Sequence, residues 1–398
     1  MMPKILIVCP LTENAIRRYV AAAKKLSLSP VLIVLVGETV AADILNSASV
    51  MYIEKLTNSP LELVEQCRNL AIKAVIAGGE FSVAATEFLA SQLGLIRCMK
   101  GRPDVLRNKY TMRMAFQREG VDQPALLGVA GNMSEVDEVV RKITSYPIIT
   151  KPADMAGSWF VSLNMTPEEI PANTKPIFEY KTSKVTGLEF AGLCVFEEFF
   201  EGDEYSAEVI VFESRILAMY FNKKLLSQLP YFDEIGHICG IALSDPLRNR
   251  LQKNIRGVLR AADVHNGILH VEFKLKDDKM VIIEVGCRIA GDKISNLVEL
   301  KYGVNLEECM ILIKSGVEPQ LPTASNEYLY GIRFLFGDDK PISSANVQIV
   351  ENAMEHGNLG THNLQRTHIS NRIGYQICKS RHYDELATTI SSLGRVDI

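Results

Sequence analysis

The sequence predicts an α/β protein in which a parallel sheet is followed by separate α+β lobes. In the first hundred residues, short β-branched runs alternate with amphipathic stretches, which indicates a parallel sheet covered by helices. From residue 193 onward, apolar runs that suit antiparallel strands predominate. The length of 398 residues is enough for about two or three domains, each able to bury a core.

The N-terminal elements follow this alternation. Strands are predicted at 5–8, 31–36 and 74–77, and helices at 13–26, 61–70 and 81–93. The segment after the first strand reads CPLTENAIRR and contains no glycine, so the Gly-x-Gly-x-x-Gly loop of a dinucleotide-binding fold is absent. The sequence therefore favours the parallel sheet and argues against an NAD site.

A change of composition near Arg102 predicts a second unit. Helices are expected over NKYTMRMAFQREG and over 134–142, followed by a strand at 146–151 that ends on Lys151. The loop PADMAGSW then leads into the strand-like run FVSL. A strand, a loop of small residues and a second strand predict a hairpin that could fold over a ligand.

The rest of the chain predicts an antiparallel lobe and a small α+β appendage. Strands are expected at 193–200, 204–212, 216–221, 267–274 and 279–285, and helices at 246–262 and 306–314. After 319–322, the appendage is expected to hold strands at 328–336 and 374–379 and a helix at 383–393.

Composition excludes several function classes. The 43 basic and 47 acidic side chains give a net charge of −4, so a nucleic-acid partner is not expected. The apolar run 30–37 is far shorter than the ~20 residues of a membrane span, and we expect a cytoplasmic protein without a membrane partner. The eight cysteines occur singly, which suits reduced core residues and not zinc ligands.

The segment HVEFKLKDDKMVIIEVGCRIAGD predicts a hairpin with two facing carboxylates. Glu272 and Glu284 are 12 residues apart on adjoining strands. Like charges paired across strands repel each other, and Mg²⁺ between them would explain why both are present. Arg288 could clamp a phosphate or a carboxylate near this metal. A solvated hairpin with ordinary salt bridges is the alternative.

Two further segments suggest nucleotide binding. Lys151, followed by Gly157 and Ser158, offers an ammonium group and backbone N–H groups for phosphates, although a mobile surface hairpin is the alternative. VFEEFFEGDEYS contains Glu197, Glu198, Phe199, Phe200 and Glu204. Its apolar walls suit a flat base and Glu204 could accept ribose hydroxyls, but a core strand that meets a turn is also consistent with this pattern.

Together and in this order, these segments resemble the ATP-grasp family. The matching segments lie over about residues 108–300 and are NKYTMRMAF, ITKPADMAGSWFV, VFEEFFEGDEYSAEV, YFDEIGHICG, HVEFK and IIEVGCRIAGDKI. IRFLF and NRIGYQI are similar to the C-terminal lobe of L-amino-acid ligases and related carboxylate–amine (dipeptide) ligases. The resemblance implies an ATP-grasp fold with a Rossmann-like domain at 1–107, a lid at 108–185, a large antiparallel subdomain at 186–322 and the α+β appendage at 323–398.

The resemblance also implies roles for individual residues. Lys109 and Lys151 would contact nucleotide phosphates, under a loop closed by Gly157 and Ser158. The strand Glu197, Glu198, Phe199 and Phe200 would hold adenine through its backbone, with Glu204 on the ribose. Glu272 and Glu284 would bind Mg²⁺, for which Mn²⁺ can substitute.

On the substrate side, the resemblance places Glu234 and His237 against the substrates. Residues 290–293, including Gly291 and Asp292, would line the pocket for the first amino acid. Arg288 would bind substrate and stabilise the transferred phosphoryl group or the acyl-phosphate oxygens. His237 or Glu234 could relieve the amine of its proton or bind its ammonium group, and for His237 a structural histidine is the alternative.

Two positions depart from the family. Gly286 stands where many members have a metal-binding Asn, which leaves the number of magnesium ions open. Phe160 stands where the closing loop commonly has a glycine, so loop closure is expected to differ, and Trp159, the only tryptophan, could report it.

The resemblance implies an ATP- and Mg²⁺-dependent ligase that joins a small carboxylic or amino acid to the amine of an amino acid, through an acyl phosphate and with release of ADP and phosphate. Dipeptide synthesis in antibiotic biosynthesis would suit this chemistry. The alternatives are an ATP-grasp enzyme of the purine-synthesis or carboxylase type and a non-catalytic nucleotide-binding protein. The oligomeric state stays open, with a homodimer as one option.

Overall fold

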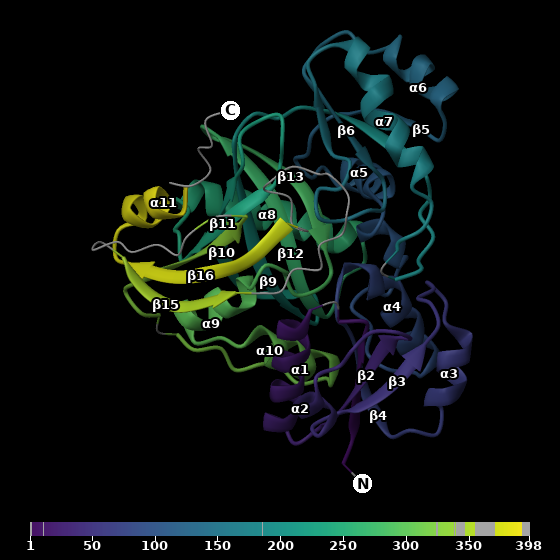
Figure 1. Ribbon diagram of the computed structural model, residues 1–398, viewed down its shortest axis with the longest axis vertical. Helices are drawn as coiled ribbons and strands as arrows, with labels where there is room; N and C mark the ends of the chain where they lie inside the picture. The colour runs from purple at the N-terminus through teal and green to yellow at the C-terminus, as the bar shows by residue number, and fades with distance from the viewer. Residues whose placement is uncertain are drawn as a thin grey trace.

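A computed structural model describes residues 2–10, 12–184, 186–323, 325–337, 339, 347–354 and 371–391. Within these ranges the chain forms a parallel four-stranded sheet, a small antiparallel four-stranded sheet and an eight-stranded antiparallel sheet (Figure 1). The predicted α/β fold class, with a parallel sheet followed by antiparallel lobes, is therefore confirmed.

The N-terminal sheet is buried on both faces. Its strands are β1 (Lys4–Val8), β2 (Ser29–Leu35), β3 (Ser49–Ile53) and β4 (Ile72–Ala77), in the order β3-β2-β1-β4. Alternation along β1 sends Ile5 and Ile7 into the core with α1 (Glu13–Lys25) and α10 (Leu306–Lys314). Leu6 and Val8 point the other way, toward α3 (Leu61–Cys67) and α4 (Val83–Gln92). Because α10 comes from late in the chain, the N-terminal sheet shares its core with the large sheet.

The small sheet projects from the body of the molecule (Figure 1). Its order is β5-β8-β6-β7, from β5 (Leu126–Ala130), β6 (Ile148–Pro152), β7 (Ser162–Asn164) and β8 (Cys194–Glu198). Helices α6 (Met133–Val140) and α7 (Ile170–Glu179) pack on it. The strand β8 lies beyond residue 185, so this sheet extends past the boundary predicted there.

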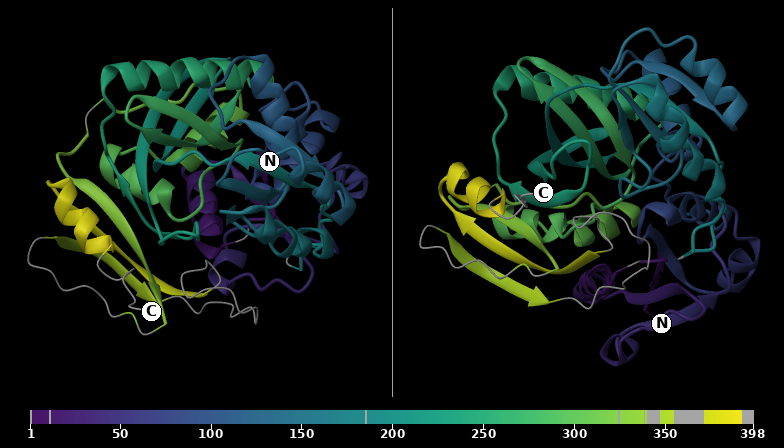
Figure 2. Two further views of the ribbon diagram at one scale, coloured as in Figure 1. Left: turned by 90° about the horizontal axis from the view of Figure 1, so that it is seen from above. Right: turned by 45° about the horizontal axis from the view of Figure 1, so that its top comes forward.

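The large sheet has the order β13-β12-β9-β10-β11-β14-β16-β15. Its strands are β9 (Asp203–Phe212), β10 (Arg215–Leu226), β11 (Glu234–Cys239), β12 (Gly267–Lys276), β13 (Lys279–Gly286), β14 (Leu329–Phe336), β15 (Gln348–Met354) and β16 (Arg372–Ser380). The strands predicted as an appendage, β14 and β16, continue this sheet without a break (Figure 2).

Helices cover both faces of the large sheet. Helix α8 (Asp245–Ala261) packs on one face with α5 (Lys109–Arg118), while α9 (Ile294–Tyr302) and α10 pack on the other. Helix α11 (Tyr383–Ser391) covers β11, β14 and β16. The predicted end of this last helix, at 392–393, lies outside the described residues. Short turns of 3-10 helix at Glu80–Ser82, Pro103–Leu106 and Pro167–Glu169 and the short helix α2 (Ala42–Leu45) complete the elements in these ranges.

Candidate active site

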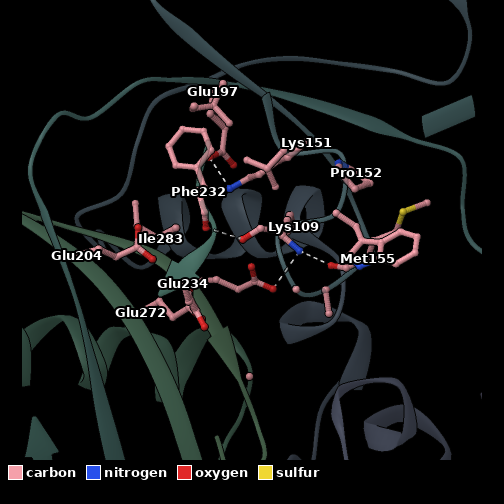
Figure 3. Close-up of a pocket in the computed structure, with 18 of the residues that line it drawn as sticks. Lys109, Lys151, Pro152, Met155, Glu197, Glu204, Phe232, Glu234, Glu272 and Ile283 are labelled. Atoms are coloured by element: carbon pink, nitrogen blue, oxygen red, sulfur yellow. Dashed lines mark hydrogen bonds and ion pairs between the residues drawn. The ribbon is translucent and has the colours of Figure 1, made fainter. Parts of the chain in front are cut away.

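One cavity lies between the small sheet and the large sheet, beside the N-terminal sheet (Figure 3). Most of the predicted site residues line it: Lys109, Lys151, Gly157, Ser158, Glu197, Glu198, Phe199, Phe200, Glu204, Glu234, Glu272, Glu284 and Arg288. Three others, His237, Gly291 and Asp292, do not line it. His237 and Asp292 lie directly behind its wall, because the His237 Nε2 is 3.5 Å from Glu234 and 3.3 Å from Asp292.

We call the part of the cavity under the small sheet its lid end, defined by Lys109, Lys151, Gly157, Ser158 and Glu197. Glu197 and Lys151 come from the neighbouring strands β8 and β6, and the Lys151 Nζ is 2.7 Å from the Glu197 carboxylate (Figure 3). Arg113 of α5 binds the same carboxylate at 2.8 Å. No pattern in the sequence marks Arg113 as a partner of Glu197, because this contact depends on how α5 packs against β8.

Burial lowers the pKa of Lys151 to about 8, and the charges of Arg113 and Lys109 act in the same direction. Glu197 offsets part of this effect. Lys151 lines the cavity together with Lys109, while Arg113 lies behind the cavity wall and binds the Glu197 carboxylate that Lys151 also faces.

Lys109 is placed by the start of a helix. Asn108 caps α5, its side chain accepting hydrogen bonds from the backbone N–H groups of Tyr110 and Thr111. Lys109, the first residue of the helix, donates to the Met155 carbonyl at 2.7 Å and lies 3.0 Å from a Glu284 oxygen (Figure 3). It therefore links the loop after β6 with the large sheet.

The loop after β6 has a strained backbone at its tip. Gly157, Ser158 and Phe160 all have positive φ, of 70°, 57° and 56°. A β-carbon disfavours this conformation, so Phe160 occupies a position that suits the glycine common in the family. The rings of Trp159 and Tyr180 pack against Phe160, and Ser158 Oγ donates to the Phe232 carbonyl at 3.3 Å. Aromatic packing thus holds the loop over the cavity.

Beyond the loop, the cavity has a wall for a flat group. Phe199 and Phe232 line it, and the ammonium of Lys274 lies 5.2 Å and 5.5 Å from the centroids of their rings. Both distances are within the range of a cation–π contact. Glu204 faces Lys224 of β10 at 2.9 Å.

Lys224 is buried beneath the cavity and joins three carboxylates. Its ammonium is 2.9 Å from Glu204, 2.6 Å from Glu234 and 3.1 Å from Glu272. Burial alone would lower the pKa of this lysine, but the three carboxylates outweigh it and hold the pKa well above its ordinary value. Lys224 belongs to no sequence motif; it lies near the end of β10.

Glu272 and Glu284 are direct cross-strand partners, as the sequence predicted. The pairing depends on a β-bulge, because Phe273 pairs with Ile282 and the next pair is Glu272 with Glu284. The extra residue, Ile283, reverses the alternation of β13 and turns Glu284 to the face of Glu272. Without the bulge, the second carboxylate would point into the core with Ile282.

The acidic pair fits a divalent cation such as Mg²⁺. Both carboxylates line the cavity, and oxygen donors of this kind are what Mg²⁺ takes from proteins. In the structure cations balance their charge: Lys109 lies beside Glu284, and Lys224 and the His270 Nε2 lie beside Glu272. Burial would lower the pKa of His270, but Glu208 and Glu272 raise it to about 10, so its imidazole is charged.

Arg288 is held by Glu80, which was not among the predicted site residues. Its Nε donates to Glu80 Oε2 at 2.6 Å, and Arg107 binds the other oxygen at 2.9 Å. Burial would raise the pKa of Glu80, but the charges of Arg288 and Arg107 outweigh it and lower the pKa to about 2. The N-terminal sheet thus orients a side chain of the large sheet.

This pair explains Gly286. A β-carbon at residue 286 would lie 2.9 Å from Glu80 Oε2 and 3.6 Å from the Arg288 Nε. The space that the metal-binding Asn of other family members would need is therefore filled by the Glu80–Arg288 pair. Glu272 and Glu284 are the metal-ligand candidates that remain here among the predicted residues.

The opposite side of the cavity, its β11 end, is defined by Glu234, His237, Asp292 and Arg372. Asp292 accepts hydrogen bonds from Arg372 at 2.6 Å and 3.1 Å, and His237 Nε2 is 3.3 Å away. Burial would lower the pKa of His237, but its contacts with Asp292 and Glu234 outweigh it, so the pKa is raised and the charged form is favoured. Arg372 was not among the predicted site residues.

Residues 144–296 match a family model described as ATP-grasp domain. The chain contains an ATP-grasp domain. The resemblance inferred from the sequence is thereby confirmed, and this domain holds Lys151, Glu272, Glu284 and Arg288, while Lys109 and Arg372 lie outside the matched residues.

The ATP-grasp chain is also similar to amino-acid ligases. It is 24% identical over 275 residues to alanine–anticapsin ligase of Bacillus subtilis, covering 66% of this chain and 58% of that protein. The crystal structure of an L-amino acid ligase from Bacillus licheniformis matches with a TM-score of 0.78 at 18% identity, covering 98% and 97% of the two chains. Phosphoribosylglycinamide synthetase from Anaerococcus prevotii matches with a TM-score of 0.68 at 17% identity over 97% and 96%. At such identities, the structural matches show the shared ATP-grasp fold alone.

Among the residues that the structure describes, no helix has the length and apolarity to cross a membrane.

Proposed function

We propose that the protein is an ATP-dependent ligase that joins the carboxylate of a small acid or amino acid to the amine of an amino acid, with release of ADP and phosphate. The observation that carries the proposal is one cavity in which the Glu272–Glu284 pair lies between the lysines of the lid end and Arg288. The similarity to amino-acid ligases supports it.

The lid end would hold the nucleotide. Lys109, Lys151 and the backbone of the loop at Gly157 and Ser158 present positive groups for the phosphates. The wall at Phe199 and Phe232 suits adenine, and Glu204 is placed to accept ribose hydroxyls.

Glu272 and Glu284 would hold Mg²⁺, with Mn²⁺ as a substitute, and Lys109 would shift from Glu284 to a phosphate when the ion binds. The ion supplies neutralisation of phosphate charge when it is bound. Arg288, oriented by Glu80, would stabilise the oxygens of the acyl phosphate.

The chemistry requires activation because a carboxylate oxygen is a poor leaving group. Transfer of the γ-phosphoryl group to the acid makes an acyl phosphate and ADP. The ammonium group of the amine substrate loses a proton, for which Glu234 is the candidate acceptor, and the neutral nitrogen attacks the carbonyl carbon. The bond to phosphate then breaks, and the nitrogen releases its second proton to the departing phosphate or to solvent. A loop held closed by aromatic contacts keeps water away from this intermediate.

The resemblance to the ligases implies that Asp292 lines the pocket of the first amino acid; we propose instead that the β11 end binds the amine substrate, because Asp292 lies beside His237 and Glu234. The His237 Nε2 lies 3.5 Å from Glu234 and 3.3 Å from Asp292, so the imidazole is placed to hold these two carboxylates in position. The carboxylates would receive the substrate ammonium group.

The test is a screen of amino acids and small dicarboxylic acids, in pairs, for phosphate release and an amide product at saturating MgATP. We expect one or more pairs to give ADP, phosphate and amide in equal amounts. ATP binding without any turnover, across the panel and in the presence of either Mg²⁺ or Mn²⁺, would contradict the proposal.

The variant Glu284→Gln separates catalysis from binding alone. We expect product formation to fall by about 100-fold or more because the charge of one metal ligand is lost. If the biological role survives this change, the protein is a nucleotide-binding protein without catalysis. Turnover with formate or bicarbonate in place of an amino acid would support an enzyme of the purine-synthesis or carboxylase type.

A further inference from the structure

The guanidinium of Arg372 is hydrogen-bonded to other residues of the β11 end through both of its terminal nitrogens. It donates to both oxygens of Asp292, at 2.6 Å and 3.1 Å, and to the Glu234 carbonyl at 3.0 Å. The guanidinium also lies over Phe334, with its Cζ 3.5 Å from the ring centroid. The side chain is only 11% exposed and lines the cavity.

A β-bulge aims Arg372 at the site. Phe334 pairs with Tyr375 and Leu335 with Gly374, but Phe336 pairs with Arg372, so Ile373 is an extra residue in β16. Regular alternation would place Arg372 on the α11 side of the sheet. The bulge turns it to the face of Phe334 and His237 instead, as bulges do beside functional sites.

The carboxylate that Arg372 binds is attached to a strained backbone. Asp292 and Lys293 have φ of 56° and 57°, a left-handed conformation that non-glycine residues seldom adopt. Burial would raise the pKa of Asp292, but the charge of Arg372 outweighs it and the pKa lies well below its ordinary value. A strained segment persists where its surroundings fix it, and the two hydrogen bonds from Arg372 do so here.

Glu234 reaches the same face through a second bulge. Leu225 pairs with Gly236 but Leu226 pairs with Glu234, which leaves Ile235 as the extra residue. Glu234 therefore joins His237 and Lys224 on the cavity face. Two separate bulges thus bring Glu234 to His237 and bring Arg372 to Asp292, the other carboxylate that faces His237.

We propose that Arg372 is a positioning residue that sets Asp292 and Glu234 to receive the ammonium group of the amine substrate. The inference rests on the ligase function proposed above. Oxygen and nitrogen atoms of Glu234, His237 and Asp292 lie within 4.8 Å of one another, a spacing that a metal ion could also use. Arg372 occupies both Asp292 oxygens and Lys224 binds Glu234, so a further cation with one positive charge fits this group better than a divalent ion.

Two amines distinguish the role of Arg372. Hydroxylamine is uncharged near neutral pH and traps acyl phosphates as hydroxamates, so it needs no ammonium site. With MgATP and the acid found in the screen, we expect Arg372→Gln to keep hydroxamate formation within about threefold of the unaltered protein. In amide formation with an amino acid, we expect the KM for that amine to be about 10- to 100-fold higher in Arg372→Gln than in the unaltered protein, while the KM for ATP stays unchanged.

A variant of matched charge controls for the loss of one arginine from this strand region. Arg381, directly after β16, is exposed and pairs with Glu327, so Arg381→Gln should change neither reaction. In Arg372→Ala, added methylguanidinium should restore amide formation in part, which a purely structural role would not allow.

Equal losses of hydroxamate and amide in Arg372→Gln, or unchanged amide kinetics, would overturn the role of Arg372 while the ligase function stands. Absence of hydroxamate with the unaltered protein across the whole acid panel would instead remove the ligase function, and the role of Arg372 with it. Tight binding of Mn²⁺ that Glu234→Gln abolishes and Glu284→Gln does not would show that the β11 end is a metal site, and would also overturn the proposal.

Discussion

The two ends of the cavity are built differently. At the lid end, Lys151 and Glu197 lie on neighbouring strands in regular register, and Lys109 is the first residue of a capped helix. At the β11 end, Glu234 and Arg372 reach the site through bulges, and Asp292 has a strained backbone. The comparison shows that the lysines of the lid end follow from regular strand register and a capped helix, whereas Glu234 and Arg372 of the β11 end reach the cavity face only through bulges.

The largest effect is expected from Lys224→Met, because this lysine joins Glu234 of the β11 end to Glu272 of the carboxylate pair. It binds Glu204, Glu234 and Glu272, and its loss would leave three carboxylates without their shared cation. We expect the free energy of unfolding to fall by about 3–5 kcal/mol, measured by urea denaturation. If the free energy of unfolding, hydroxamate formation and amide formation are all unchanged, Lys224 does not couple the β11 end to the Glu272–Glu284 pair.

Glu80→Gln should be the next largest, and its effect should depend on pH. The folded-state pKa of Glu80 is about 2, below its ordinary value of 4.5, so its ion pairs stabilise the fold above pH 4.5 and this stabilisation is lost as the pH falls toward 2. The variant should lose about 3 kcal/mol of unfolding free energy at pH 7 and much less at pH 2.5.

Urea unfolding of both proteins at the two pH values measures this difference. A loss that is equal at pH 7 and pH 2.5 would show that Glu80 acts through packing and not through its charge. Arg102→Gln is a suitable control, since its ion pair with Asp104 is exposed.

Gly286→Asn tests whether the Glu80–Arg288 pair excludes the family's third metal ligand. The new side chain would meet Glu80 Oε2, so we expect a loss of about 1–3 kcal/mol in unfolding free energy and a lower kcat without tighter binding of Mg²⁺. Increased Mg²⁺ affinity with full activity would mean that the Glu80–Arg288 pair can move aside and that an asparagine at residue 286 can bind the metal ion as in other ATP-grasp proteins.

The smallest effect is expected at the loop tip, where Phe160→Gly would relieve the positive φ but remove the ring packed on Tyr180. Relief of the backbone strain should raise the free energy of unfolding by about 1 kcal/mol, and loss of the aromatic contact should lower it by about the same amount. We expect the KM for ATP to rise a few-fold, with a red shift in the fluorescence of Trp159. An unchanged amine KM would confine the change to the lid end.

The sequence predicted the lid end better than the β11 end. Lys151, Glu272 and Glu284 lie in short runs whose residue types carry their own chemistry, so local patterns were enough to select them, whereas Lys109 was selected through the resemblance to the ATP-grasp family. Arg372 could not be found this way, because it lies 80 residues from its partner Asp292 and regular alternation would place it on the opposite face of the sheet.

The fold shows the same limit. The strands β1, β2 and β4 and the hairpin of β12 and β13 follow from apolar patterns, but β3 and β5 are half-exposed and carry weak patterns, and they were not predicted. The continuity of β14 and β16 with the large sheet depends on pairing between distant segments, which composition does not reveal. The domain limits at 107, 185 and 322, the homodimer and the cytoplasmic location stay predictions.

The position of Arg372 has a consequence for the protein during its own synthesis. The ribosome makes Lys109 to Arg288 first, and β16 only much later. A growing chain can therefore acquire all the side chains proposed for acid activation while Asp292 still lacks its guanidinium partner. On the role proposed for Arg372, amide formation would be coupled to ATP use only after the strand that carries this residue has emerged and joined the sheet.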